Sequence, residues 1–111
     1  MNRIINLTPH TINILIPKGH KLDIFPSGRI ARLSYETESA GALEYEDAEI
    51  EVTRHTNPVI DNLPEPEPDT FYIVPLVVAQ AAKRADVLSP ARLVRDADGY
   101  PIGCTGFMAH V

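Results

Sequence analysis

Thr8-Pro9-His10 places a hydroxyl, a proline and an imidazole in three consecutive positions. An imidazole beside a break in a strand can donate or accept a proton, or bind the polar edge of a ligand. The alternative is structural, because Pro9 interrupts a hydrogen-bonded ladder and its neighbours can satisfy the freed backbone groups. Thr8 and His10 are therefore either ligand-binding residues or residues that only satisfy the backbone groups freed by Pro9.

Ser27-Gly28-Arg29 is a glycine-containing turn that ends in an arginine. Backbone N–H groups of such a turn can bind an anion, and the guanidinium group adds positive charge. The alternative is an ordinary hairpin turn with a solvated arginine. Ser27, Gly28 and Arg29 are the second group of candidate ligand-binding residues.

Arg92 and Arg95 are three residues apart on an expected strand. In a regular strand they would face opposite sides, so one could point into a pocket. Tyr72 and Phe107 could stack on a planar ligand, although both types serve equally well in a core, which is the role we favour for them. These four residues complete the candidate ligand site.

Catalysis and metal binding receive little support. Cys104, the only cysteine, could act as a nucleophile with one of the four histidines, or His10 could act as a base in a small hydrolase or transferase. However, a free cysteine is usually a small buried hydrophobe. Asp96-Ala97-Asp98-Gly99 lacks the later ligands of a calcium loop, and zinc-ligand spacing is also missing. We predict no catalytic residue, metal or cofactor.

Length and charge limit the possible functions. The 111 residues predict a single domain, 1–111, and the net charge of −5 disfavours long nucleic acid as a partner. Seven acids and no Lys or Arg lie between Glu36 and Glu51, so the remainder is about +2. A single cysteine fits a reducing compartment. Without an apolar leader or membrane-spanning run, we expect a cytoplasmic protein that avoids membranes.

Apolar alternation predicts several short strands. Two strands flank the break at residues 8–10, and a turn at 17–20 leads to a strand at 21–25. Further strands are expected at 29–35, 48–54, 70–74, 93–95 and 100–108. The acidic stretch 36–47 reads as an exposed hairpin loop or a mobile flap, and Asn57-Pro58 as a turn.

One helix is expected at 76–84, with Pro75 at its first position, where a missing N–H is tolerated. The proline-rich segment 63–69 predicts a stiff connector, and Asp96–Gly99 a tight hairpin turn. The fold class is therefore α+β: a small bent antiparallel sheet or partly open β-barrel with one short helix packed on it. Barrel closure or a homo-oligomer would cover the exposed sheet edges.

Three segments carry a resemblance to other proteins: INLTPH (5–10), FPSGRIARLS (25–34) and the run from YIVP (72–75) through LVRDADGYPIGC (93–104). In these segments the chain resembles a group of small bacterial and phage proteins. The resemblance implies a compact phage or mobile-element protein that acts on host defence. It brings no catalytic motif and assigns no functional residue.

Three functions follow from these observations. The first is a non-enzymatic, homo-oligomeric protein that binds a small anionic, nucleotide-like ligand; in a phage it would sequester a nucleotide-derived immune signal. The second is a protein-binding inhibitor or accessory factor that uses a sheet edge or the acidic stretch. The third is the small hydrolase or transferase that would use Cys104 or His10.

Overall fold

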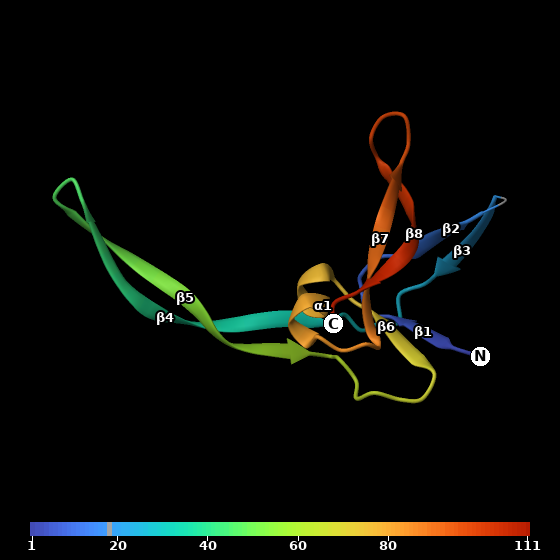
Figure 1. Ribbon diagram of the computed structural model, residues 1–111, viewed down its shortest axis with the longest axis horizontal. Coiled ribbons are helices and arrows are strands. Elements are labelled where there is room, and N and C mark those ends of the chain that lie inside the picture. Colours follow the sequence, from blue (N-terminus) through green and yellow to red (C-terminus); the bar gives the residue numbers. More distant parts are fainter. Residues whose placement is uncertain (18) are drawn as a thin grey trace.

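The structure is a computed structural model that describes residues 1–17 and 19–111. Lys18, within the turn expected at 17–20, lies outside the described residues. Figure 1 shows a body of short strands around one helix, with a long ribbon projecting from it. The elements in chain order are β1 (Arg3–Asn6), β2 (Ile12–Ile16), β3 (His20–Ile24), β4 (Arg32–Tyr45), β5 (Ala48–Asp61), β6 (Thr70–Ile73), α1 (Leu76–Ala82), β7 (Val87–Arg95) and β8 (Pro101–Ala109).

Six strands form one curled sheet in the order β1-β6-β7-β8-β2-β3. A bridge between Asn6 and Pro26 brings the two ends of this sheet together, which gives a half-barrel. The predicted α+β class with a curled, partly open barrel is confirmed. The sheet is mixed, however, because β1–β6, β6–β7 and β2–β8 pair in parallel. Parallel pairs need crossover connections, and helix α1 provides the one between β6 and β7.

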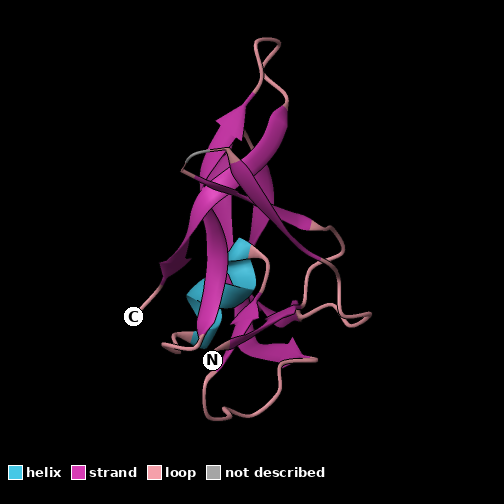
Figure 2. Cartoon of the chain, turned by 90° about the vertical axis from the view of Figure 1, so that its right-hand side faces the viewer, coloured by secondary structure: helices cyan, strands magenta, loops and turns pink. Residues whose placement is uncertain are grey.

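Helix α1 covers the main core. It starts after Pro75 and ends at Lys83, whose left-handed backbone donates its N–H to the carbonyl of Ala79. Val78 and Ala79 are buried against residues of β6, β7 and the segment after β1. Figure 2 shows the helix set among the strands of the body. The helix is shorter than the predicted 76–84, since the left-handed residue at 83 terminates it.

Strands β4 and β5, with 14 residues each, form a separate two-stranded sheet. We call residues 32–61 the arm and the rest of the chain the body. The prediction of a loop or flap at 36–47 is wrong for residues 36–45, which belong to β4 and pair with β5 except at the register shift of residues 40–41; only Glu46 and Asp47 form the turn. The turn expected at Asn57-Pro58 is also wrong, since both residues lie within β5. Register shifts at Ser34/Glu36 and Ser39/Ala42 let the ribbon bend and twist.

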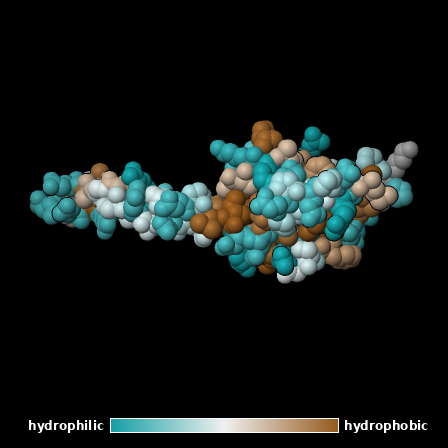
Figure 3. All heavy atoms as spheres, turned by 90° about the horizontal axis from the view of Figure 1, so that it is seen from below, coloured by the Kyte–Doolittle hydropathy of each residue, from teal (hydrophilic) through white to brown (hydrophobic). Residues whose placement is uncertain are grey.

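The arm makes the molecule unusually extended. The radius of gyration is 18.5 Å and the extents are 63 × 39 × 25 Å, whereas a compact chain of this length has a radius of gyration of about 13 Å. Figure 3 shows hydrophobic atoms gathered where the arm joins the body, and more polar atoms along most of its visible face. Among the described residues, no helix has the length and apolar character to cross a membrane.

Candidate binding groove and arm

An open groove of about 730 Å³ lies on the body and is lined mostly by apolar groups. Its wall is the break between β1 and β2. The other sides come from the β6–α1 junction and from the facing strands β7 and β8. The lining residues are Thr8–Asn13, Val74, Pro75, Pro90, Leu93 and Pro101–Cys104. Four separate parts of the sequence therefore build one apolar surface.

Buried Asn6 holds the wall of the groove in place. Its Nδ2 donates to the carbonyl oxygens of His10 at 2.7 Å and Ile24 at 3.0 Å. Its Oδ1 accepts from the backbone N–H of Thr8 at 2.9 Å and from the Thr8 hydroxyl at 2.6 Å. All polar atoms of this amide are used, so Asn6 links β1, the break and the end of β3. Asn6 was not predicted as a site residue, although a polar residue inside an apolar strand before Thr8-Pro9 was a usable signal.

The close packing of β8 against β2 forms the floor of the groove. A Cβ at Gly103 would lie 2.8 Å from the carbonyl oxygen of Asn13, so only glycine fits without a shift. The expectation that glycines beside Cys104 mark a close backbone approach is confirmed at Gly103 and not at Gly106, where a Cβ would meet nothing within 4 Å. Cys104 itself is buried with Ile12 and Ile73.

Thr8 and His10 are the two predicted ligand residues that line the groove. The Thr8 hydroxyl lies 3.1 Å from the carbonyl oxygen of His10, and the His10 N–H donates to that hydroxyl at 3.4 Å. Thr8 therefore satisfies backbone groups around Pro9, as the structural alternative expected. His10 is exposed at the wall.

The Ser27–Arg29 turn lies beside the groove wall but does not line the groove. The N–H of Ser27 donates to the carbonyl of Asn6 at 2.9 Å, which connects the turn to the residue that holds the groove wall. The Ser27 hydroxyl is within 3.4 Å of the N–H and carbonyl of Arg29. Ser27, Gly28 and Arg29 are all exposed.

The remaining four candidates are spread over the body. Arg92 and Arg95 are exposed on β7, and Arg95 donates to the carbonyl of Gly99 at 3.0 Å. Tyr72 is 1% exposed in the main core, and its hydroxyl donates to the carbonyl of Glu65. Burial, and then Glu67 and Asp86, raise the pKa of Tyr72. Phe107 is half-buried against the cluster around Cys104.

The outer half of the arm has one apolar and one acidic face. Leu43 lies opposite Ile50 and Tyr45 opposite Ala48, so their side chains share a face. Leu43, Tyr45 and Ile50 are 62%, 66% and 48% exposed. On the other face Glu44 lies directly opposite Glu49, a like-charge pair that destabilises a hairpin.

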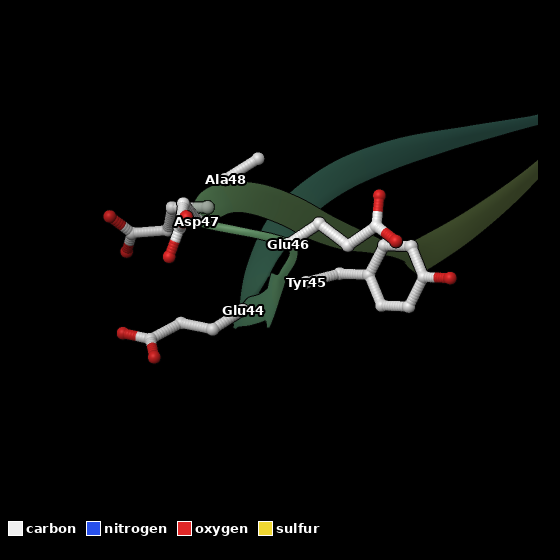
Figure 4. Close-up of a pocket in the computed structure, with 6 residues that line it drawn as sticks. Glu44, Tyr45, Glu46, Asp47 and Ala48 are labelled. Carbon is white, nitrogen blue, oxygen red and sulfur yellow. The ribbon is translucent and has the colours of Figure 1, made fainter.

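An open hollow of about 570 Å³ lies at the tip of the arm and is lined by residues 44–49. Figure 4 shows the carboxylates of Glu44, Glu46 and Asp47 spread around the turn without converging on a common point. In agreement with this, no group of three potential metal ligands occurs in the described parts of the chain.

In the inner half of the arm, side chains of β4 and β5 pair with each other. Arg54 binds Glu38 at 2.6 Å, and the rings of Tyr35 and His55 stack at 4.5 Å. At the base, Leu33 and Ile60 pack against the main core, and the Asn62 side chain donates to the carbonyl of Ile30. The arm is thus anchored at its base and lacks apolar cover at its tip.

Comparison of the chain with protein-family models, with curated proteins and with solved structures found no match. The function is therefore inferred from the groove and the arm.

Proposed function

We propose that the protein is a protein-binding module and that the arm is the element that contacts its partner. The observation that carries this proposal is the exposed apolar face of Leu43, Tyr45 and Ile50 on a ribbon that stands away from the body. An isolated two-stranded ribbon is only marginally stable in water. A partner that covers this face would both stabilise the ribbon and bury its apolar side chains.

The anchored base supports the same function. Leu33 and Ile60 fix the start of the arm in the core, so the exposed tip is presented in a defined direction. A preorganised contact surface loses less conformational entropy on binding than a flexible loop does. The arm is therefore better suited to binding than the mobile flap that the sequence suggested.

Site-specific photo-crosslinking tests this proposal. A photoreactive phenylalanine analogue replaces Tyr45 on the arm or, as the matched control, Phe25 on the body, away from the groove lining; the two native side chains are 66% and 70% exposed. We expect irradiation of the producing cells to give discrete protein adducts from position 45 and much less from position 25. Equal labelling from both positions, or none from position 45, would contradict the proposal.

A second candidate function is small-ligand binding in the body groove. Its volume of about 730 Å³ falls in the range of small-molecule sites, which are mostly apolar with a few polar groups. A flat base would suit this lining. The phosphates of a nucleotide-derived signal would rely on Arg29, Arg92 or Arg95, which are exposed outside the groove. Sequestration of such a signal, in line with the resemblance to phage proteins, is the finer form of this candidate.

Native mass spectrometry with linear, cyclic and NAD-derived nucleotides tests the second candidate. Retention of an unmodified nucleotide that is lost in Arg92→Ala/Arg95→Ala would support it. Lys83→Ala, which removes a cation from the end of α1, is the matched control. If no nucleotide binds but uncharged apolar compounds do, the groove is a ligand site and the proposal of a nucleotide-derived ligand is wrong.

A further inference from the structure

We propose that the partner of the arm is a second copy of this chain, and that the apolar face of the arm tip docks in the body groove of that copy. The inference rests on the function proposed for the arm and names its partner. Three properties of the described residues lead to it: matched apolar surfaces, opposite charge, and a contact area that doubles when two arms are exchanged.

The apolar surfaces match in character and in shape. The arm presents Leu43, Tyr45 and Ile50 on a narrow projecting ribbon. The groove is open and apolar, and two of its lining residues, Leu93 and Ile102, are exposed. Each molecule thus carries both a projecting apolar edge and an apolar recess, each uncovered within its own chain. Docking one in the other removes both surfaces from water.

The charges are complementary. Residues 32–61 hold eight of the fifteen acids and two of the ten Lys and Arg residues, a net charge of −6, which leaves the body at +1. Among the described residues, Glu46 and Asp47 in the tip turn form no ion pair, and neither do Arg92 and Arg95. The two arginines flank groove-lining Leu93 on the same strand. Glu46 and Asp47 lie in the turn at the end of the arm and are not confined to the face of Glu44 and Glu49, so an acidic tip seated near these arginines gains Coulomb energy.

Contact area favours a reciprocal exchange of arms. The docked tip, residues 42–51, is about 20 Å long and about 10 Å wide, so its apolar face covers about 200 Å². One tip in a partner's groove therefore buries about 400 Å² in total. Two tips, each in the other groove, bury about 800 Å², which is below the roughly 1,200–2,000 Å² of stable complexes and corresponds to a weak dimer that forms as the concentration rises. Twofold exchange also closes the assembly.

Sedimentation velocity over a concentration series tests the inference with the full chain. The arm variant is Leu43→Thr/Ile50→Thr, the groove variant Leu93→Thr/Ile102→Thr, and the control Leu22→Thr on β3. Threonine keeps strand propensity and all five positions are exposed, so folding is preserved. We expect a wild-type and control dimer. Each double variant should weaken dimerisation by about a hundredfold or more, since two large apolar side chains leave the interface per contact.

Mixing the two double variants tests the mode of docking. Each mixed pair retains one intact arm and one intact groove, so a weak mixed dimer should form although neither variant dimerises alone. Packing of arm against arm would give no such rescue and would overturn the inference. Raising the salt from about 50 mM to about 500 mM should weaken the wild-type dimer, because acids on the arm meet arginines on the body.

The outcomes separate this inference from the function on which it rests. Loss of association in the arm variant alone overturns docking in the groove but leaves the arm as the contact element. Unchanged association in the arm variant contradicts both. A wild-type chain that stays monomeric overturns the inference, and the photo-crosslink from position 45 then decides the function of the arm.

Discussion

Asn6 is the residue on which the geometry of the groove wall depends. Four hydrogen bonds join its amide to Thr8, His10 and Ile24. Thr8 and His10 could be selected from the sequence because a proline separates them. Asn6 could not, since its role depends on the carbonyl of Ile24, which is 18 positions away and comes near only when the sheet curls.

Asn6→Ala should lower the free energy of unfolding by about 2–4 kcal/mol, because it leaves buried polar groups without partners. Urea denaturation followed by circular dichroism measures this loss. Asn2→Ala, at an exposed position, is the control and should change stability by no more than about 0.5 kcal/mol. Similar losses in both variants would show that the hydrogen bonds of the Asn6 amide have no special role in stability.

Gly103→Ala should destabilise the body by about 1–3 kcal/mol, since its Cβ would lie 2.8 Å from a backbone oxygen of β2. Gly106→Ala on the same strand is the matched control, because open space surrounds that position. Thermal melts of the two variants compare them directly. A melting temperature lowered equally in both would argue against the close β2–β8 contact.

At the scale of elements, the proline-rich connector is tied to the body by Arg84. Its guanidinium group binds both carboxylate oxygens of Asp86, at 3.0 and 2.7 Å, and donates to the carbonyl of Pro64 at 3.0 Å. The hydrogen bond and charge of Arg84 lower the pKa of Asp86 below its ordinary 3.8. The folded state therefore favours the ionised carboxylate. Its stabilising contribution is present above the ordinary pKa and is lost as the pH falls through the lowered one.

Asp86→Asn should cost about 1–2 kcal/mol at neutral pH. The difference from wild type should shrink as the pH falls below 3.8. Denaturation at about pH 7 and about pH 3 measures it. Asp23→Asn, which removes a more exposed carboxylate 3.9 Å from Lys21, should have little effect at either pH. A difference for Asp86→Asn that does not depend on pH would contradict this assignment.

Local signals predicted the elements that depend on local geometry. The break at Pro9, the tight turn at 96–99 and a helix after Pro75 are confirmed. The arm was missed because register shifts interrupt its alternation and because acids have low strand propensity. Asn57-Pro58 looked like a turn, yet both strands of a two-stranded ribbon are edges, where proline is tolerated.

At the scale of the whole molecule, the groove could not be predicted from the sequence. Its lining joins four segments between positions 8 and 104, and the parallel pairing of β2 with β8 brings the outer two together. Such long-range pairing leaves no local pattern. By contrast, the uneven charge was visible from composition, and the structure gives it a place, because most acids of the stretch 36–51 lie on the outer arm.

Hydrogen–deuterium exchange of the wild-type chain at low and high protein concentration tests the central claim most directly. The arm tip at 42–52 and the groove wall at 10–13 belong to different surfaces of one molecule. Docking of the arm in a second copy predicts that both segments become protected together as concentration rises, while β3 does not change. Protection of only one segment, or of neither at any concentration, would contradict the account.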